Sequence, residues 1–125
     1  MKAHVTKKFL LIGSPKHPWR RTLQAAIKPL GELDASDEAQ SYLQKYEKNY
    51  DLVLVDASEV EHAEELVARL RSQLPSSRVV VVDAAPTWQQ AREAFLAGAM
   101  DYFSKTGDED KLSKLLSDLV KKPVA

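Results

Sequence analysis

The sequence predicts an α/β fold: one doubly wound sheet of five parallel strands, in the order 2-1-3-4-5, with five helices on its two faces. Three observations favour this fold. Short apolar runs alternate with amphipathic segments along the 125 residues. The runs 52–55 and 79–82 are continuous and apolar, as in strands buried on both faces. The connections are short, which favours parallel strands joined by right-handed crossovers.

The first half of the chain contains two of the expected strand and helix units. The run 9–12 predicts the first strand, because the turn residues 13–15 follow it. Pro18 suits the first turn of the next helix. The apolar residues of this helix recur at helical spacing: Trp19, Leu23, Ala26 and Ile27. Segment 33–35 predicts at best a short strand, and Ser36 can cap a second helix.

The middle of the chain repeats this alternation. Ser58 and Glu61 have the spacing of a capping box and predict the start of the third helix. Thr87 and Gln90 have the same spacing before the fourth helix, which Gly98 should end. The apolar positions of these two helices are Leu66, Val67, Leu70 and Leu74, then Ala91, Ala94 and Phe95.

The last unit is the strand 101–104 and a helix that Asp108 can cap. The apolar face of this helix is Leu112, Leu115, Leu116 and Leu119. Five units make a flavodoxin-like sheet, and we expect a single domain over residues 1–125. Segment 121–125 is typical of a linker start, as expected if the domain opens a longer chain.

Composition excludes several classes of function. Hydrophobic residues make up 44% and charged residues 29%, a globular composition, and no apolar run approaches the roughly 20 residues of a membrane helix. Lys plus Arg equals 18 and Asp plus Glu equals 18, so we expect no nucleic-acid or membrane partner. The absence of cysteine excludes disulfides and thiolate metal sites. Without a signal peptide, the expected location is cytoplasmic.

Asp56 is the residue that most needs an explanation, because it directly follows the buried run 52–55. The carboxyl ends of the strands are where open α/β sheets place their ligands. The predicted topology brings six residues to this edge: Gly13, Ser14, Asp56, Ser58, Asp83 and Lys105. The sequence therefore predicts a polar site at this edge.

Three segments carry a resemblance to a known family: 50–56 (YDLVLVD), 79–82 (VVVV) and 97–105 (AGAMDYFSK). Over nearly its whole length the chain resembles the CheY-like receiver domains of response regulators in two-component signal transduction. The resemblance implies that Asp56 stands at the phosphoacceptor position and that Lys105 contacts the phosphoryl group. It also implies that Tyr102 stands at the position of the switch aromatic.

The chain departs from the family pattern at the metal and switch positions. Receivers end the first strand with an acidic pair that holds Mg2+, and here Gly13 and Ser14 stand at those positions. Because Mg2+ prefers charged oxygen ligands, we expect weak or absent Mg2+ binding and no other metal or cofactor. Receivers place a Thr or Ser after the fourth strand to contact the phosphoryl group. Asp83 stands there instead and would repel it.

These departures lead to one expectation about charge. Lys105 should offset both Asp56 and Asp83 in a single cluster, and two acids facing one cation should raise the pKa of at least one carboxyl group. The alternative is that Asp83 replaces the lost acids as a metal ligand.

We therefore predict a pseudo-receiver, a protein-interaction module that acts without phosphorylation and is not an enzyme. By the resemblance, its partner would bind the face of the fourth helix, fifth strand and fifth helix, roughly 87–120, and a second copy of the chain is one such partner. The alternative is a phosphorylatable receiver that accepts phosphate on Asp56 with an unusual metal site. A small-molecule binder unrelated to receivers is the third hypothesis.

Some of the highlighted residues also have plainer interpretations. Asp56 could be an inherited acid in a polar pocket. Tyr102 fits a partly buried core aromatic better than a working switch, because its Thr partner is missing. Trp88 suits interface use and ordinary packing equally. The three histidines show no ligand spacing and are interpreted as surface residues: His4, His17 and His62.

Overall fold

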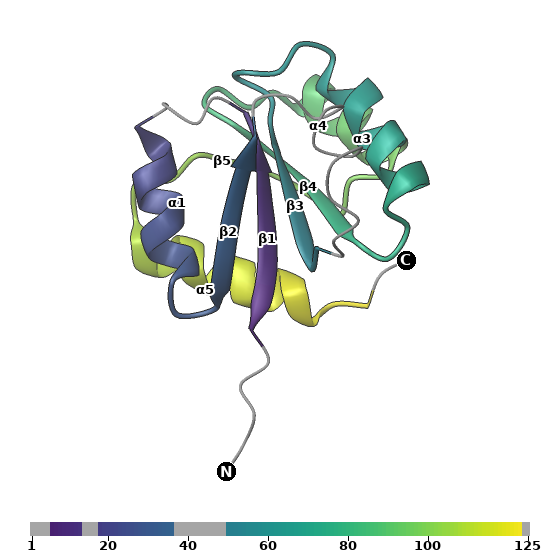
Figure 1. The fold of residues 1–125 in the computed structure, drawn as a ribbon. Coiled ribbons are helices and arrows are strands. Elements are labelled where there is room, and N and C mark those ends of the chain that lie inside the picture. Colours follow the sequence, from purple (N-terminus) through teal and green to yellow (C-terminus); the bar gives the residue numbers. More distant parts are fainter. Residues whose placement is uncertain (1–5, 14–17, 37–49, 124–125) are drawn as a thin grey trace.

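The computed structural model describes residues 6–13, 18–36 and 50–123. Five parallel strands form one sheet in the order β2-β1-β3-β4-β5, which confirms the predicted topology (Figure 1). The strands are β1 (Lys7–Ile12), β2 (Gly31–Ser36), β3 (Leu52–Asp56), β4 (Arg78–Asp83) and β5 (Asp101–Ser104). All five carboxyl ends therefore meet at one edge of the sheet.

The helices of the described ranges cover the two faces of the sheet (Figure 1). One face carries α1 (Trp19–Ile27) and α5 (Glu109–Lys121), and the other carries α3 (Ala63–Gln73) and α4 (Trp88–Ala97). The second helix predicted from the sequence falls on residues 37–49, outside the described residues. None of the helices in the described ranges is long and apolar enough to cross a membrane.

The core consists of two apolar layers, because alternate residues of a strand point to opposite faces. All five residues of β3 are buried. On the α1 and α5 side, the layer includes Leu11, Leu23, Leu54, Val82 and Leu116. On the α3 and α4 side, it includes Leu10, Val55, Leu70, Val81 and Ala94. Asp56 and Asp83 are the last residues of β3 and β4, and both are buried like the apolar residues that precede them.

The second strand is longer than the sequence predicts. It spans six residues, Gly31–Ser36, and pairs with β1 along its full length. A Cβ atom at Gly31 would collide with the Lys7 carbonyl oxygen, so the strand begins at a close backbone approach that requires glycine. Pairing with a neighbouring strand outweighs the weak local preference of this segment. Ser36 accordingly ends β2.

The capping predictions have different outcomes. Thr87 Oγ1 accepts the Gln90 N–H at 3.2 Å, and Asp108 Oδ1 accepts the Lys111 N–H at 3.1 Å, which confirms both caps. The cap predicted at Ser58 is wrong, because α3 begins only at Ala63. The Ser58 hydroxyl is instead used at the carboxyl edge of the sheet, in a tertiary contact that local spacing does not reveal.

The apolar face predicted for α4 is also partly wrong. Ala94 is buried, but Phe95 is 48% exposed, and Trp88 and Leu96 are 77% and 76% exposed. Ala94 is the only buried residue of this helix. The large apolar side chains of α4 therefore contribute little to the core.

Candidate functional site

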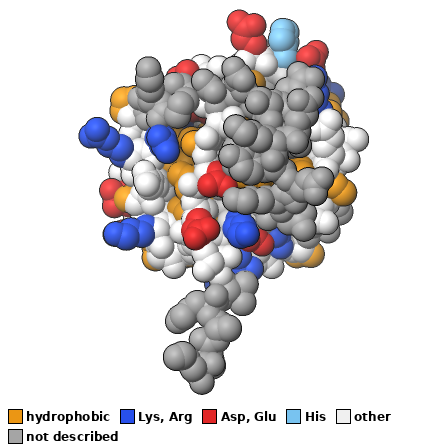
Figure 2. Space-filling model, in the orientation of Figure 1, with side chains coloured by type: hydrophobic (Ala, Val, Ile, Leu, Met, Phe, Trp, Pro, Cys, Tyr) orange, Lys and Arg blue, Asp and Glu red, His pale blue; other side chains and the backbone are white. Residues whose placement is uncertain are grey.

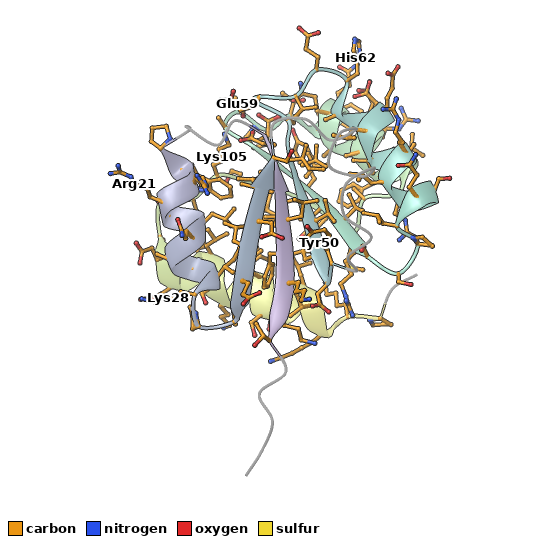
Figure 3. The ribbon with its side chains drawn as sticks, in the orientation of Figure 1. Arg21, Lys28, Tyr50, Glu59, His62 and Lys105 are labelled. Atoms are coloured by element: carbon orange, nitrogen blue, oxygen red, sulfur yellow. The ribbon has the colours of Figure 1, made fainter. Side chains whose placement is uncertain are left out.

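Asp56 and Lys105 form a buried ion pair at the carboxyl edge of the sheet. Lys105 Nζ lies 2.7 Å from Asp56 Oδ2, and the two side chains are 5% and 2% exposed. Figure 3 shows Lys105 at the same end of the sheet as Glu59 and His62, the end opposite Lys28. The two residues lie 49 positions apart in the chain (105 − 56), and the parallel topology of the sheet brings them together.

The end of β1 packs directly against Asp56. A Cβ atom at Gly13 would lie 2.7 Å from Asp56 Cβ, closer than real contacts allow. Any larger side chain at Gly13, an acid included, would require one of the two segments to move. The second predicted position of the lost acidic pair, Ser14, lies outside the described residues.

This arrangement fits Mg2+ poorly. The ion takes hard, charged oxygen ligands in near-octahedral geometry. Asp56 already uses Oδ2 for Lys105 and Oδ1 to accept the Ser58 N–H at 3.0 Å. Among the described residues, no group of three histidine or acidic side chains gathers around Asp56. A metal there would have to share the charge of Asp56 with Lys105.

Trp19 covers the ion pair from the start of α1, a contact that the sequence did not reveal. The centroid of its ring lies 5.8 Å from Lys105 Nζ, a cation–π distance. Its Nε1–H donates to the Thr106 carbonyl oxygen at 2.8 Å, which fixes the ring in place. Trp19 is only 7% exposed. Helical spacing predicted that Trp19 is buried, and only the tertiary structure shows what it covers.

Asp83 lies in a hydrogen-bond network beside the ion pair. The Tyr102 hydroxyl donates to its Oδ2 at 2.7 Å, and the Ser58 hydroxyl donates to its Oδ1 at 3.2 Å. The Ala85 N–H also donates to Oδ1, at 3.1 Å. Lys105 reaches Asp83 with its backbone N–H, which donates to the Asp83 carbonyl oxygen at 3.0 Å. Asp56 is thus paired with Lys105, Asp83 accepts from neutral donors, and Ser58 links the two carboxylates.

The network sets the protonation states of its two titratable members. Burial by itself would raise the pKa of Asp83, but the hydrogen bonds from Tyr102, Ala85, Ser58 and Ala84 outweigh it and lower that pKa below its ordinary value. The rise in pKa that was predicted for at least one of the two carboxyl groups is therefore not found at Asp83. Burial, followed by the hydrogen bond to Asp83 and its charge, raises the pKa of Tyr102 to about 12. A carboxylate and a neutral phenol therefore face each other at physiological pH.

Gln90 connects this network to α4. Its side-chain oxygen is placed 3.2 Å from the Tyr102 hydroxyl. The phenol has one hydrogen, which the shorter bond to Asp83 uses, so Gln90 satisfies this contact when its amide is turned to donate its NH2 group. The position of the Tyr102 ring is consequently fixed from β4 and from α4 together.

A second polar group that the sequence did not reveal lies at the start of α3. Potential ligand atoms of His62, Glu64 and Glu65 all lie within 4.8 Å of one another. His62 Nδ1 is 3.9 Å from Glu64 Oε1, and the His62 side chain is 70% exposed, which confirms the predicted surface position. Acids in the first turn of a helix are favoured by the helix dipole, which accounts for Glu64 and Glu65 without a bound metal. We therefore assign this group no metal.

Solved structures of receiver domains share this fold. A response regulator from Thermotoga maritima matches with a TM-score of 0.81 and 22% identity, over 94% of this chain and 100% of that one. The signal receiver domain of an HD domain-containing protein from Pseudomonas fluorescens Pf-5 matches with a TM-score of 0.79 and 24% identity, over 97% and 91%. An orphan response regulator of H. pylori matches with a TM-score of 0.76 and 24% identity, over 91% and 96%.

No family model matches the sequence. No curated protein matches it either. The structural likeness nevertheless places the chain in the class of proteins that have the CheY-like response-regulator receiver fold. At these identities the likeness establishes the fold alone, so the role of each residue at the carboxyl edge has to be argued from its contacts.

Proposed function

We propose that the chain is a cytoplasmic, receiver-like signal-transduction module that acts through protein interaction and does not depend on phosphorylation of Asp56. The observation that carries this proposal is the 2.7 Å hydrogen bond from the Tyr102 hydroxyl to Asp83. In the family, a Thr or Ser at the position of Asp83 responds to the phosphoryl group and draws the switch aromatic inward. Here a permanent carboxylate accepts from the aromatic residue directly, so the switch needs no phosphate.

The closed surroundings of Asp56 support the same proposal. A phosphoryl donor must approach the carboxylate in line, and charge must be neutralised in the transition state. Asp56 is 2% exposed and its Oδ2 is occupied by Lys105. A phosphoryl group would also lie near Asp83, because Ser58 contacts both carboxylates, and the added negative charge would be repelled.

The outer face of α4 supports a protein partner. Trp88, Phe95 and Leu96 are the exposed large hydrophobic residues of the described ranges, and all three lie on this one helix. Aromatic side chains are enriched at protein interfaces and often dominate their binding energy. We propose that the partner contacts this face together with β5 and α5, as the receiver resemblance implies.

The phosphorylatable receiver remains a second candidate, and one observation favours it. Asp56 and Lys105 stand at the receiver positions and are in direct contact at 2.7 Å. Lys105 could transfer this contact to a phosphoryl oxygen if Trp19 and the end of β1 moved aside.

One NMR titration separates the two candidates. Isotope-labelled protein is titrated with Mg2+ and then with beryllofluoride, a phosphoryl mimic, while the amides of Asp56, Asp83, Tyr102 and Lys105 are followed. We expect no saturable shifts at millimolar Mg2+ and no response to beryllofluoride. Saturable shifts that extend to Tyr102 would contradict the proposal and establish the phosphorylatable receiver.

A matched variant sharpens the test. Asp83→Thr returns the family's hydroxyl to the switch position and removes the carboxylate that holds Tyr102. If phosphorylation independence rests on Asp83, the Tyr102 ring signals should change in this variant without any added ligand. Unchanged ring signals would mean that Asp83 does not control the switch aromatic.

A further inference from the structure

A small cavity lies between α3 and α4, beside the switch aromatic. Its volume is about 110 Å³, and Tyr102 and Gln90 are among the residues that line it. These are the two residues whose side chains meet at 3.2 Å in the Asp83 network. A molecule in this cavity would therefore touch the residues that fix the position of Tyr102.

The apolar part of the cavity exists because small residues face it from three elements. Ala57 follows β3, Ala63 begins α3, and Ala94 is the buried residue of α4. Val60 and Val81 complete the apolar lining. Larger side chains at any of the three alanines would fill this space. For comparison, an engineered apolar cavity of about 150 Å³ binds benzene, so the space here suits a compact aliphatic group of about four carbons.

The polar part of the lining is acidic. Glu64 and Glu93 line the cavity with His62, and none of the described residues that line it is a lysine or an arginine. The adjoining segment 57–68 carries four glutamates and no lysine or arginine, although the whole chain has no net charge. Figure 3 labels His62 at this edge, and Figure 2 shows acidic side chains around it in the same orientation. The local potential therefore favours a cation.

We propose that this cavity binds a small primary alkylammonium ion, with its carbon body against the alanines and its ammonium group between Glu64 and Glu93. Occupancy would be sensed by Tyr102 through Gln90, so the ligand would regulate the interaction module in place of phosphate. This last step rests on the function proposed above; the binding step does not. The ion fits because it combines a short apolar body with a charge that the two glutamates complement.

The test uses isobutylammonium chloride and the intact 125-residue chain. Its amides are followed by NMR, with sodium chloride added to equal ionic strength in the reference. We expect saturable shifts at Ala57, Ala63 and Ala94, and a concurrent shift at Tyr102. Isobutanol, of similar shape and uncharged, should bind at least about fivefold more weakly, and isobutyrate should give no saturable shift. Equal binding of isobutanol, or no saturation with the ammonium ion, would overturn the proposal.

Substitutions of two kinds test the charge and the space separately. Glu93→Gln changes an exposed side chain and should weaken isobutylammonium at least about fivefold. Glu109→Gln, at the exposed start of α5 and away from the cavity, is the matched control and should leave binding unchanged. Ala94→Leu should abolish binding by filling the cavity, and Ala63→Val tests the same point from α3 if the first variant folds poorly. Wild-type affinity in Glu93→Gln would contradict the site.

The outcomes also separate this inference from the proposed function. Shifts at the alanines without any shift at Tyr102 would retain the binding site and overturn its regulatory role. A complete absence of binding would leave the beryllofluoride result untouched, because that titration concerns Asp56.

Discussion

Helices α4 and α5 use their apolar residues in opposite ways. Helix α5 buries Leu112, Leu116, Leu119 and Val120 against the sheet. Helix α4 buries Ala94 and turns Trp88, Phe95 and Leu96 toward solvent. Burial of large side chains stabilises the fold, whereas an exposed cluster marks a surface that other molecules can use. The comparison teaches that the large apolar residues of α5 stabilise the core, whereas those of α4 form a surface that is exposed to solvent.

The network around Tyr102 is consistent with this difference. Because α4 has little buried area of its own, the contact between Gln90 and Tyr102 is one of the few polar links between this helix and the sheet. A weakly anchored helix can shift at low cost in free energy when a neighbouring contact changes. On the other face, α5 contributes four buried residues to the apolar layer, so its displacement would cost more free energy.

The largest expected effect tests the comparison directly. Leu116→Ala removes a fully buried side chain of α5 and should lower the free energy of unfolding by about 2–5 kcal/mol. Phe95→Ala removes a larger but half-exposed side chain of α4 and should lower it by less than about 1 kcal/mol. Urea denaturation measures both. Equal losses would show that α4 contributes to the core as much as α5.

The next effect concerns the link between α4 and the sheet. Tyr102→Phe removes the donor to Asp83 and leaves a buried carboxylate with fewer hydrogen bonds. The free energy of unfolding should fall by about 1–3 kcal/mol. Hydrogen exchange should accelerate in α4 more than in α5. Uniform acceleration in both helices would mean that the network stabilises the domain as a whole and has no special role in holding α4.

The hydrogen bond between Tyr102 and Asp83 predicts that the free energy of unfolding depends on pH in both the acid and the alkaline range. The lowered pKa of Asp83 means that its contribution to stability is present above its ordinary pKa and is lost as the pH falls through the lowered value. Tyr102 behaves in the opposite sense: its contribution is present below its ordinary pKa of 10.0 and is lost as the pH rises through about 12.

Urea denaturation as a function of pH measures both losses of stability, the acid limb from Asp83 and the alkaline limb from Tyr102. Tyr102→Phe should remove the alkaline loss that belongs to this group, and Asp83→Asn should reduce the acid loss. An unchanged alkaline limb in Tyr102→Phe would contradict the assignment of that limb to Tyr102.

The smallest expected effect is at the exposed end of α4. Trp88→Ala should change the free energy of unfolding by no more than about 0.5 kcal/mol, because the side chain is 77% exposed. A loss of about 2 kcal/mol or more, on the scale of about 2–5 kcal/mol expected for a buried side chain, would mean that Trp88 packs within the domain in solution. The recognition role of α4 would then lose its main support.

The sequence by itself determined the elements whose signals are local. Continuous apolar runs specified β3 and β4, helical spacing specified the buried faces of α1 and α5, and the side chains of Thr87 and Asp108 specified two helix starts. The strand order was expected from the flavodoxin-like fold class, and the meeting of Asp56 and Lys105 follows from that order. These features depend on neighbours in the chain and on rules common to α/β folds.

Only the tertiary structure decided the contacts that give the site its character. Trp19 covers Lys105, Gly13 packs against Asp56, and the Tyr102 hydroxyl selects Asp83. Ser58 had the spacing of a helix cap, yet its hydroxyl bonds to Asp83, and Phe95 had helical spacing, yet it faces solvent. Each of these outcomes is a competition among partners from distant segments, and their distances and directions are set only when the sheet and helices have packed.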